Sequence, residues 1–61
     1  MLSEREKEIA GMICDGKTNR MIAGMLILSI DTVNTHRKNI FRKLNVHNIA
    51  SLVQAMLKYN K

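Results

Sequence analysis

The sequence predicts a single all-α domain built from four short helices. Apolar residues recur every three or four positions, no segment alternates as a strand does, and the chain contains no proline. With 61 residues the chain is long enough for one domain, and a domain of this size buries only roughly 60% of its unfolded surface. We therefore expect residues 1–61 to form one unit with a thin core of packed helices.

The first helix is expected over residues 4–14. Ser3 is followed three residues later by Glu6, which is the capping box: hydroxyl and carboxylate each accept a hydrogen bond from a free backbone N–H. Gly16 supplies the left-handed conformation that ends many helices. The apolar positions of this helix are Ile9, Met12 and Ile13.

Two helices joined by a three-residue turn are expected over residues 19–26 and 30–44. Thr18 and Ser29 precede them as N-caps, because a hydroxyl there accepts a bond from a free backbone N–H. Ile27 lies in the turn and is β-branched, so we expect it to keep a negative φ. The apolar positions are Ile22, Met25 and Leu26 in one helix, and Val33, Ile40 and Leu44 in the other.

A fourth helix is expected over residues 49–59, after a left-handed cap at Asn45 and an N-cap at Asn48. One side of it carries a core stripe of Ile49, Leu52 and Met56. A second, displaced face consists of Ala50, Val53 and Leu57, with Gln54 at its edge. One small domain cannot cover both faces. The second face therefore packs either under the N-terminal segment or against a second copy of the chain.

Positive charge is concentrated in the middle of the chain. The net charge is +5 overall, with −2 in residues 1–15 and +5 in residues 16–44. The third predicted helix carries a polar stripe opposite its apolar one, formed by Asp31, Asn34, Thr35, Lys38 and Arg42. Its basic run of Arg37, Lys38, Arg42 and Lys43 would by itself also fit a solvated face. A helix that is basic and polar on one side and follows another helix after a tight turn, as residues 30–44 do, favours a helix-turn-helix whose second helix enters the DNA major groove.

Several other classes of protein are disfavoured by the sequence. The longest apolar run, residues 25–28, is too short to span a membrane, and residues 1–10 are too charged for a signal peptide, so we expect a cytoplasmic protein. A small hydrolase or redox enzyme would have to use Cys14, His36 and His47, which lack partner residues. We expect no enzyme, no metal and no cofactor.

Three segments occur in the order found in one known family. They are L-S-x-R-E at residues 2–6, G-K-T-N-R at residues 16–20, and L-S-x-x-T-V-x-x-H-x-x-N-I-x-x-K-L at residues 28–44. This sequence resembles the LuxR-type helix-turn-helix family over residues 2–57. The resemblance implies a four-helix DNA-binding output domain of a bacterial transcription regulator, commonly attached to a phosphorylation receiver or a ligand-binding sensor. Residues 1–61 would then be the C-terminal domain of a longer regulator.

The resemblance also implies partners and a role for individual residues. The partners are double-stranded DNA, a second copy of the chain, and RNA polymerase as a further candidate. Base contacts are implied for Asn34, Thr35 and Lys38. Phosphate contacts are implied for Lys17, Thr18, Asn19, Thr32 and Arg42. The dimer contact is implied for Ala50, Val53, Gln54 and Leu57.

Chemistry supports the three base contacts. An asparagine can pair with adenine, a lysine can donate to guanine, and a threonine methyl can touch the methyl of thymine. Many relatives carry lysine at the position of Asn34. Asparagine at this position points toward adenine-containing sites. Met21 stands where the family commonly has an acidic residue, so Thr18 lacks a capping-box partner. The alternative function is a protein-interaction module that uses the second face of residues 49–59.

Overall fold

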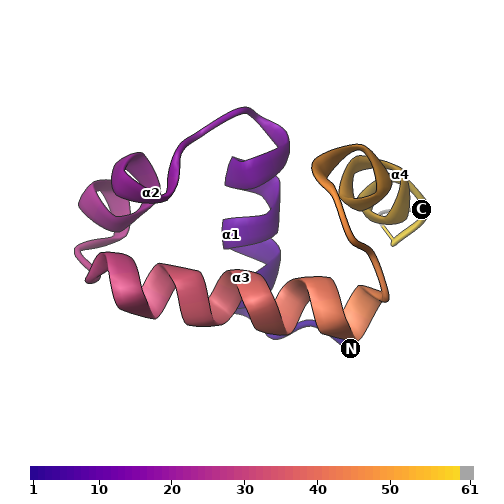
Figure 1. Ribbon diagram of the computed structural model, residues 1–61, viewed down its shortest axis with the longest axis horizontal. Coiled ribbons are helices and arrows are strands. Elements are labelled where there is room, and N and C mark those ends of the chain that lie inside the picture. Colours follow the sequence, from indigo (N-terminus) through magenta and orange to yellow (C-terminus); the bar gives the residue numbers. More distant parts are fainter. Residues whose placement is uncertain (60–61) are drawn as a thin grey trace.

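The structure, a computed structural model, describes residues 1–59 and contains four α-helices joined by short turns (Figure 1). The helices are α1 (Glu4–Cys14), α2 (Asn19–Leu26), α3 (Ile30–Leu44) and α4 (Ile49–Tyr59). No strand occurs within the described residues. The predicted all-α fold and the four predicted helix ranges are confirmed.

Side chains that begin the helices account for the agreement. Ser3 Oγ accepts from the Glu6 backbone N–H at 3.1 Å, and Glu6 Oε1 accepts from the Ser3 N–H at 2.8 Å, which completes the capping box. Ser29 Oγ accepts from the N–H of Thr32 at 3.1 Å. Asn48 Oδ1 accepts from the N–H of Ser51 at 2.8 Å. These bonds lie within four residues of sequence, so the helix starts are encoded locally.

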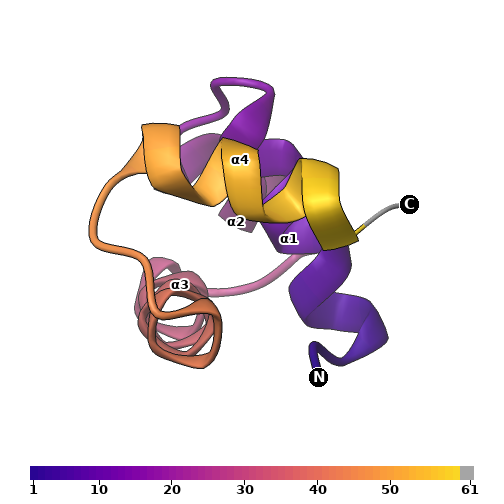
Figure 2. The same ribbon diagram turned by 90° about the vertical axis from the view of Figure 1, so that its right-hand side faces the viewer.

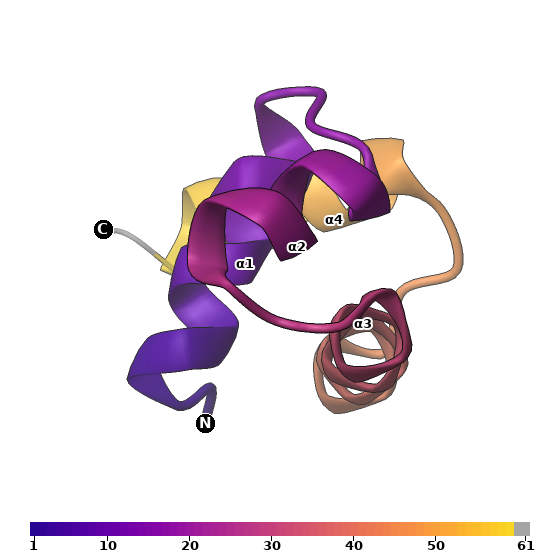
Figure 3. The same ribbon diagram turned by 90° about the vertical axis from the view of Figure 1, so that its left-hand side faces the viewer.

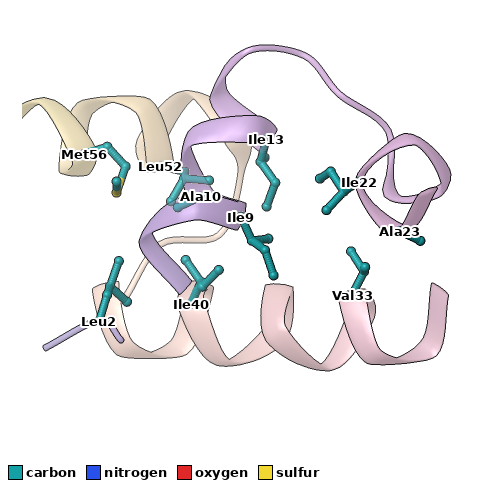
Figure 4. Packing of buried hydrophobic residues seen from close by; sticks show 10 residues of the cluster. All are labelled: Leu2, Ile9, Ala10, Ile13, Ile22, Ala23, Val33, Ile40, Leu52 and Met56. Carbon is teal, nitrogen blue, oxygen red and sulfur yellow. The ribbon is translucent and has the colours of Figure 1, made fainter. Parts of the chain in front are cut away.

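The core lies where α1 crosses behind α3, with α2 and α4 on either side of α1 (Figures 1 and 4). Ile9, Ile13 and Ile40 are almost fully buried. Each such side chain stabilises the fold by about 1.5–3 kcal/mol through the apolar area that it removes from water. The remaining buried apolar residues are Leu2, Ala10, Ile22, Ala23, Val33, Leu52 and Met56. No described helix is both long and apolar enough to cross a membrane.

The turn between α2 and α3 differs from the prediction. Ile27 has φ +56° and ψ +50°, the left-handed conformation, whereas its β-branched side chain led us to expect a negative φ. The backbone explains the difference: the N–H groups of Ile27 and Leu28 both donate to the carbonyl of Ala23, and a left-handed residue is what lets α2 close in this way. The Ile27 side chain is 91% exposed, so its branch meets no packed neighbour.

Two residues placed on apolar faces are exposed. Met25 is 55% exposed. The buried face of α2 is narrow and centred on Ile22 and Ala23. Since successive residues of a helix are rotated by roughly 100°, Met25 points away from that face. Ile49 is 46% exposed. It is the first residue of α4, and most of the turn that precedes it is itself exposed.

Candidate nucleic-acid interface

The outer side of α3 is not covered by any other element of the described chain. Figures 2 and 3 view α3 end-on from opposite directions, and in both its outer edge has no other element of the described chain beside it. Val33 and Ile40 face the core, and most of the predicted polar stripe lies on the opposite side. The exposed members of the stripe are Asp31, Thr35, Lys38 and Arg42. Thr32, which was not part of the stripe, is exposed as well. The helix therefore presents a continuous polar surface to solvent.

The hydroxyl groups on this surface already have partners. Thr35 Oγ1 donates to the backbone carbonyl of Asp31 at 3.1 Å, one helical turn earlier. The hydroxyls of Ser29 and Thr32 share a hydrogen bond of 2.8 Å at the start of the helix. Because the Thr35 hydroxyl donates its proton to the backbone, the side chain can make new contacts through its methyl group, or by accepting a hydrogen bond at its oxygen.

Lys38 and Arg42, two exposed cations of α3, lie about one helical turn apart. Lys38 is exposed and, within the described part of the chain, has no ion-pair or hydrogen-bond partner. Arg42 is also exposed and gives one N–H to Asn39 Oδ1 at 2.8 Å, which leaves its other donors available. A lysine and an arginine in these states can donate to a base edge and to a phosphate, respectively.

The start of α2 offers further donors. Thr18 Oγ1 accepts from the Met21 N–H at 3.1 Å, so α2 begins after Thr18 although no acidic residue stands at position 21. The first backbone N–H groups of a helix lack partners inside the helix and favour anions. Lys17, half-buried, precedes this start. Cationic and amide donors are thus combined where phosphate contacts were expected.

A hydrogen-bonded chain that was not expected from the sequence joins α2 to α3. Asn19 Nδ2 donates to Asn34 Oδ1, and Arg37 Nη1 donates to Asn19 Oδ1 at 3.2 Å. The Arg37 guanidinium also lies 5.4 Å from the centre of the Phe41 ring. Asn34 is consequently half-buried. The spacing of Asn34, Arg37 and Phe41 could have shown that these residues share one face of α3. Nothing in the sequence indicated that Asn19 bonds to Asn34 and Arg37.

Lys43 belongs to the predicted basic run but turns toward α1. Its Nζ lies 2.8 Å from Glu6 Oε1 and 3.1 Å from Oε2. The hydrogen bond from Lys43, followed by that from the Ser3 N–H, lowers the pKa of Glu6 from 4.5 to about 2. Arg37 is likewise engaged with its neighbours. Of the run, Lys38 and Arg42 are therefore the members that remain directed to solvent.

The second face of α4 is largely uncovered. Leu57 is 68% exposed, and Ala50 and Gln54 are exposed, whereas Val53 is half-buried. Val53 and Leu57 line a shallow depression between α4 and the end of α1. The other residues around it are Gly11, Cys14, Asp15 and Met56. Packing within the chain thus shields Val53 in part but leaves the rest of the face exposed.

The residues considered for an enzyme lie on different elements. Cys14 is the last residue of α1, His36 is in the middle of α3, and His47 is in the turn before α4. Burial, with a smaller contribution from the charge of Asp15, raises the pKa of the Cys14 thiol. The sulfur is therefore kept in its less nucleophilic, protonated form.

Comparison with known proteins agrees with this geometry. Residues 1–56 match the family described as "Bacterial regulatory proteins, luxR family". The uncharacterized response regulatory protein YgeK of Escherichia coli K12 is 51% identical over 57 residues, and the monoamine regulon transcriptional regulator of Klebsiella aerogenes is 45% identical over 53. These alignments cover 93% and 87% of this chain, but 39% and 23% of the two relatives.

A solved structure shows the same fold. The response regulator ChrA of a heme-sensing two-component system superposes on 98% of this chain with a TM-score of 0.90 and 37% sequence identity. The chain matches 30% of that protein. The relatives in both comparisons are thus considerably longer than these 61 residues.

Proposed function

The chain belongs to the luxR family of bacterial regulatory proteins, and from this premise we propose that it binds specific double-stranded DNA sequences to regulate transcription. In this proposal α3 lies in the major groove and α2 crosses the neighbouring phosphate backbone. The observation that carries it is the bare outer side of α3, where the unpaired Lys38 and the exposed Arg42 project from an otherwise polar surface. Family membership and relatives named as transcription regulators support the same role.

Each side chain has a role that suits its chemistry. Asn34, Thr35 and Lys38 read bases, since they lie within one turn of one another on α3. The phosphate contacts come from both helices, through Lys17, Thr18, Asn19, Thr32 and Arg42. Phosphate contacts fix the register of the protein on the duplex, whereas base contacts select the sequence. The residues around the start of α2 and those of α3 together form one half of the proposed DNA-binding surface.

The other half is a second copy of the chain. Ala50 and Leu57 are exposed on the apolar second face of α4, with the half-buried Val53 between them and the exposed Gln54 at the edge. Two copies joined through α4 would read related half-sites about one helical turn apart. Because the relatives are longer, we further propose that the chain is the output domain of a longer cytoplasmic regulator, which carries a phosphorylation receiver or a ligand-binding sensor. We also propose that RNA polymerase is its partner at the promoter.

Selection of bound duplexes from a random pool, followed by affinity measurements at several salt concentrations, tests the proposal. We expect enrichment of one motif, and a binding constant that falls steeply with salt because phosphate contacts release counterions. The exposed face of α4 also fits a protein-interaction module. Binding to a protein partner that hardly responds to salt, with no enriched duplex, would support that alternative and overturn DNA binding.

A further inference from the structure

We infer that Arg37 acts through Asn19 to fix which end of the Asn34 amide is presented to DNA, and that Asn34 therefore donates to a base that offers a hydrogen-bond acceptor at that position and not to one that offers only an amino group. The inference rests on the proposed function, because it concerns how α3 reads a sequence. It concerns three side chains that bond to one another across two helices. Arg37 and Asn19 are positioning residues in this scheme, and Asn34 is the residue that reads.

The direction of the hydrogen bonds follows from the chemistry of arginine. A guanidinium has donors and no acceptor. The atom of the Asn19 amide that faces Arg37 must consequently be the oxygen, as the 3.2 Å contact from Nη1 to Oδ1 shows. The nitrogen of Asn19 is then left to face Asn34, whose oxygen accepts from it. One donor-only group thus sets the orientation of both amides.

Phe41 holds the guanidinium in place. The centre of its ring lies 5.4 Å from the Arg37 guanidinium carbon, within the range of a cation–π contact. Phe41 is itself half-buried against the core. Arg37 is therefore held by two contacts, one with the Phe41 ring and one with the Asn19 oxygen.

Asn34 is left with a defined polarity. Its oxygen is turned toward α2, so its NH₂ group is the end available to a ligand on the outer side of α3. An asparagine that pairs with adenine in the bidentate manner must bring both oxygen and nitrogen to the base edge. The amide held by Asn19 brings the two donors instead. Guanine N7 and O6, thymine O4 and adenine N7 accept such a bond, whereas the amino group of cytosine does not.

Asn19→Asp reverses this arrangement without removing it. A carboxylate still accepts from Arg37, but it has no proton for Asn34, so the Asn34 amide must turn its NH₂ inward and its oxygen outward. An aspartate in the first turn of α2 is also compatible with the helix dipole. We expect the base preference at the position read by Asn34 to move toward bases with an amino group, by roughly 2- to 10-fold, as for one hydrogen bond.

Thr18→Asp is the matched control. It adds the same charge one residue earlier and keeps an N-cap side chain, but it does not touch the Arg37–Asn19–Asn34 chain. It should weaken binding to all duplexes and leave the relative base preferences unchanged. Arg37→Met should blur the preference at the Asn34 position, and Arg37→Lys, which restores a donor without an acceptor, should recover it. Equal base preferences for wild type and Asn19→Asp would overturn the inference.

Nuclear magnetic resonance of the free chain tests the amide orientation without DNA. In the wild type we expect the Asn19 NH₂ protons to exchange slowly with water and those of Asn34 to exchange fast. In Asn19→Asp the Asn34 NH₂ protons should become protected. Fast exchange of the Asn34 protons in both proteins would overturn the inference, whatever the DNA result. A selection that enriches no duplex for any variant would overturn the proposed function, and these spectra would still decide the orientation of Asn34.

Discussion

Lys43 of α3 bonds to both carboxylate oxygens of Glu6 in α1, at 2.8 and 3.1 Å. The same carboxylate accepts from the backbone N–H of Ser3 at 2.8 Å. The side chain of Glu6 is only 6% exposed, whereas that of Lys43 is 44% exposed. One carboxylate therefore caps α1 and also fixes α1 to the C-terminal half of the helix proposed to read DNA. The positive charge of Lys43 is thus paired with Glu6 of α1 and not placed on the surface proposed to face DNA.

Glu6→Gln is expected to lower the free energy of unfolding by about 1–3 kcal/mol, the worth of a hydrogen bond to a charged group. Glutamine can still accept from Ser3 in a capping box, so the loss reports the contact with Lys43. The midpoint of urea unfolding measures it. Glu8→Gln is the control, because its pair with Arg5 is exposed and should change stability by less than about 0.5 kcal/mol. Equal losses in the two variants would contradict a special role for Glu6.

The free energy of unfolding should also depend on pH through the ionisation of Glu6. Its pKa in the folded chain is about 2, below the ordinary value of 4.5, so the carboxylate is favoured by folding. The stabilisation is present above about pH 4.5 and is lost as the pH falls toward 2. Unfolding free energies measured between pH 7 and pH 2.5 should therefore fall more for the wild type than for Glu6→Gln. Parallel curves for the two proteins would count against this coupling.

The sequence was sufficient for features whose cause is local. Ser3, Thr18 and Ser29 each bond to a backbone N–H three residues later, so helix starts could be predicted from neighbouring residues alone. Asn45 likewise adopts the expected left-handed conformation at the end of α3, with φ +54°. The exposed side of α3 was also predictable, because a period of 3.6 residues separates its polar stripe from Val33 and Ile40.

Contacts between helices were not predictable. Glu6 and Lys43 are 37 positions apart, and Asn19 and Asn34 are 15 apart, so no periodicity relates them. From the sequence, Glu6 was expected only in a capping box and Lys43 in a basic run. Asn19 was expected to contact phosphate and Asn34 to contact a base. Ile27 departs from the preference of its β-branched side chain because its N–H and that of Leu28 both donate to the carbonyl of Ala23 where α2 ends.

Ile27→Asn should stabilise the domain by roughly 0.5–1 kcal/mol. A left-handed conformation costs an L-residue with a large side chain about 1–2 kcal/mol, and asparagine tolerates it better. The 91% exposed side chain of Ile27 contributes little packing that could be lost. Asn45→Ile is the reciprocal control, because Asn45 has the same conformation at φ +54°, and it should be destabilised. Urea midpoints that move in the opposite direction for either variant would contradict the argument.

Lys38→Ala should lose sequence discrimination, whereas Lys17→Ala should weaken binding to all duplexes alike. Lys38 projects from the middle of the exposed side of α3, and a base contact there is worth about 1–3 kcal/mol of discrimination at one base pair. Lys17 lies before α2, where only phosphates are within reach in the proposed complex. Affinities for the selected duplex and for random duplex measure both effects. Equal losses on both duplexes for Lys38→Ala would show that it contacts phosphate.

Leu57→Glu should leave the single domain folded but remove cooperative binding to paired half-sites. Because the Leu57 side chain is 68% exposed, a charge at this position is tolerated in the free chain. In a symmetric contact between two α4 helices, each copy would bury one such charge without a partner. The added charge also weakens attraction to DNA, so affinity for one half-site must be compared with affinity for two. Leu57→Met keeps an apolar side chain and should retain cooperativity. If Leu57→Glu binds paired half-sites as cooperatively as the wild type, the two copies do not meet through this face of α4.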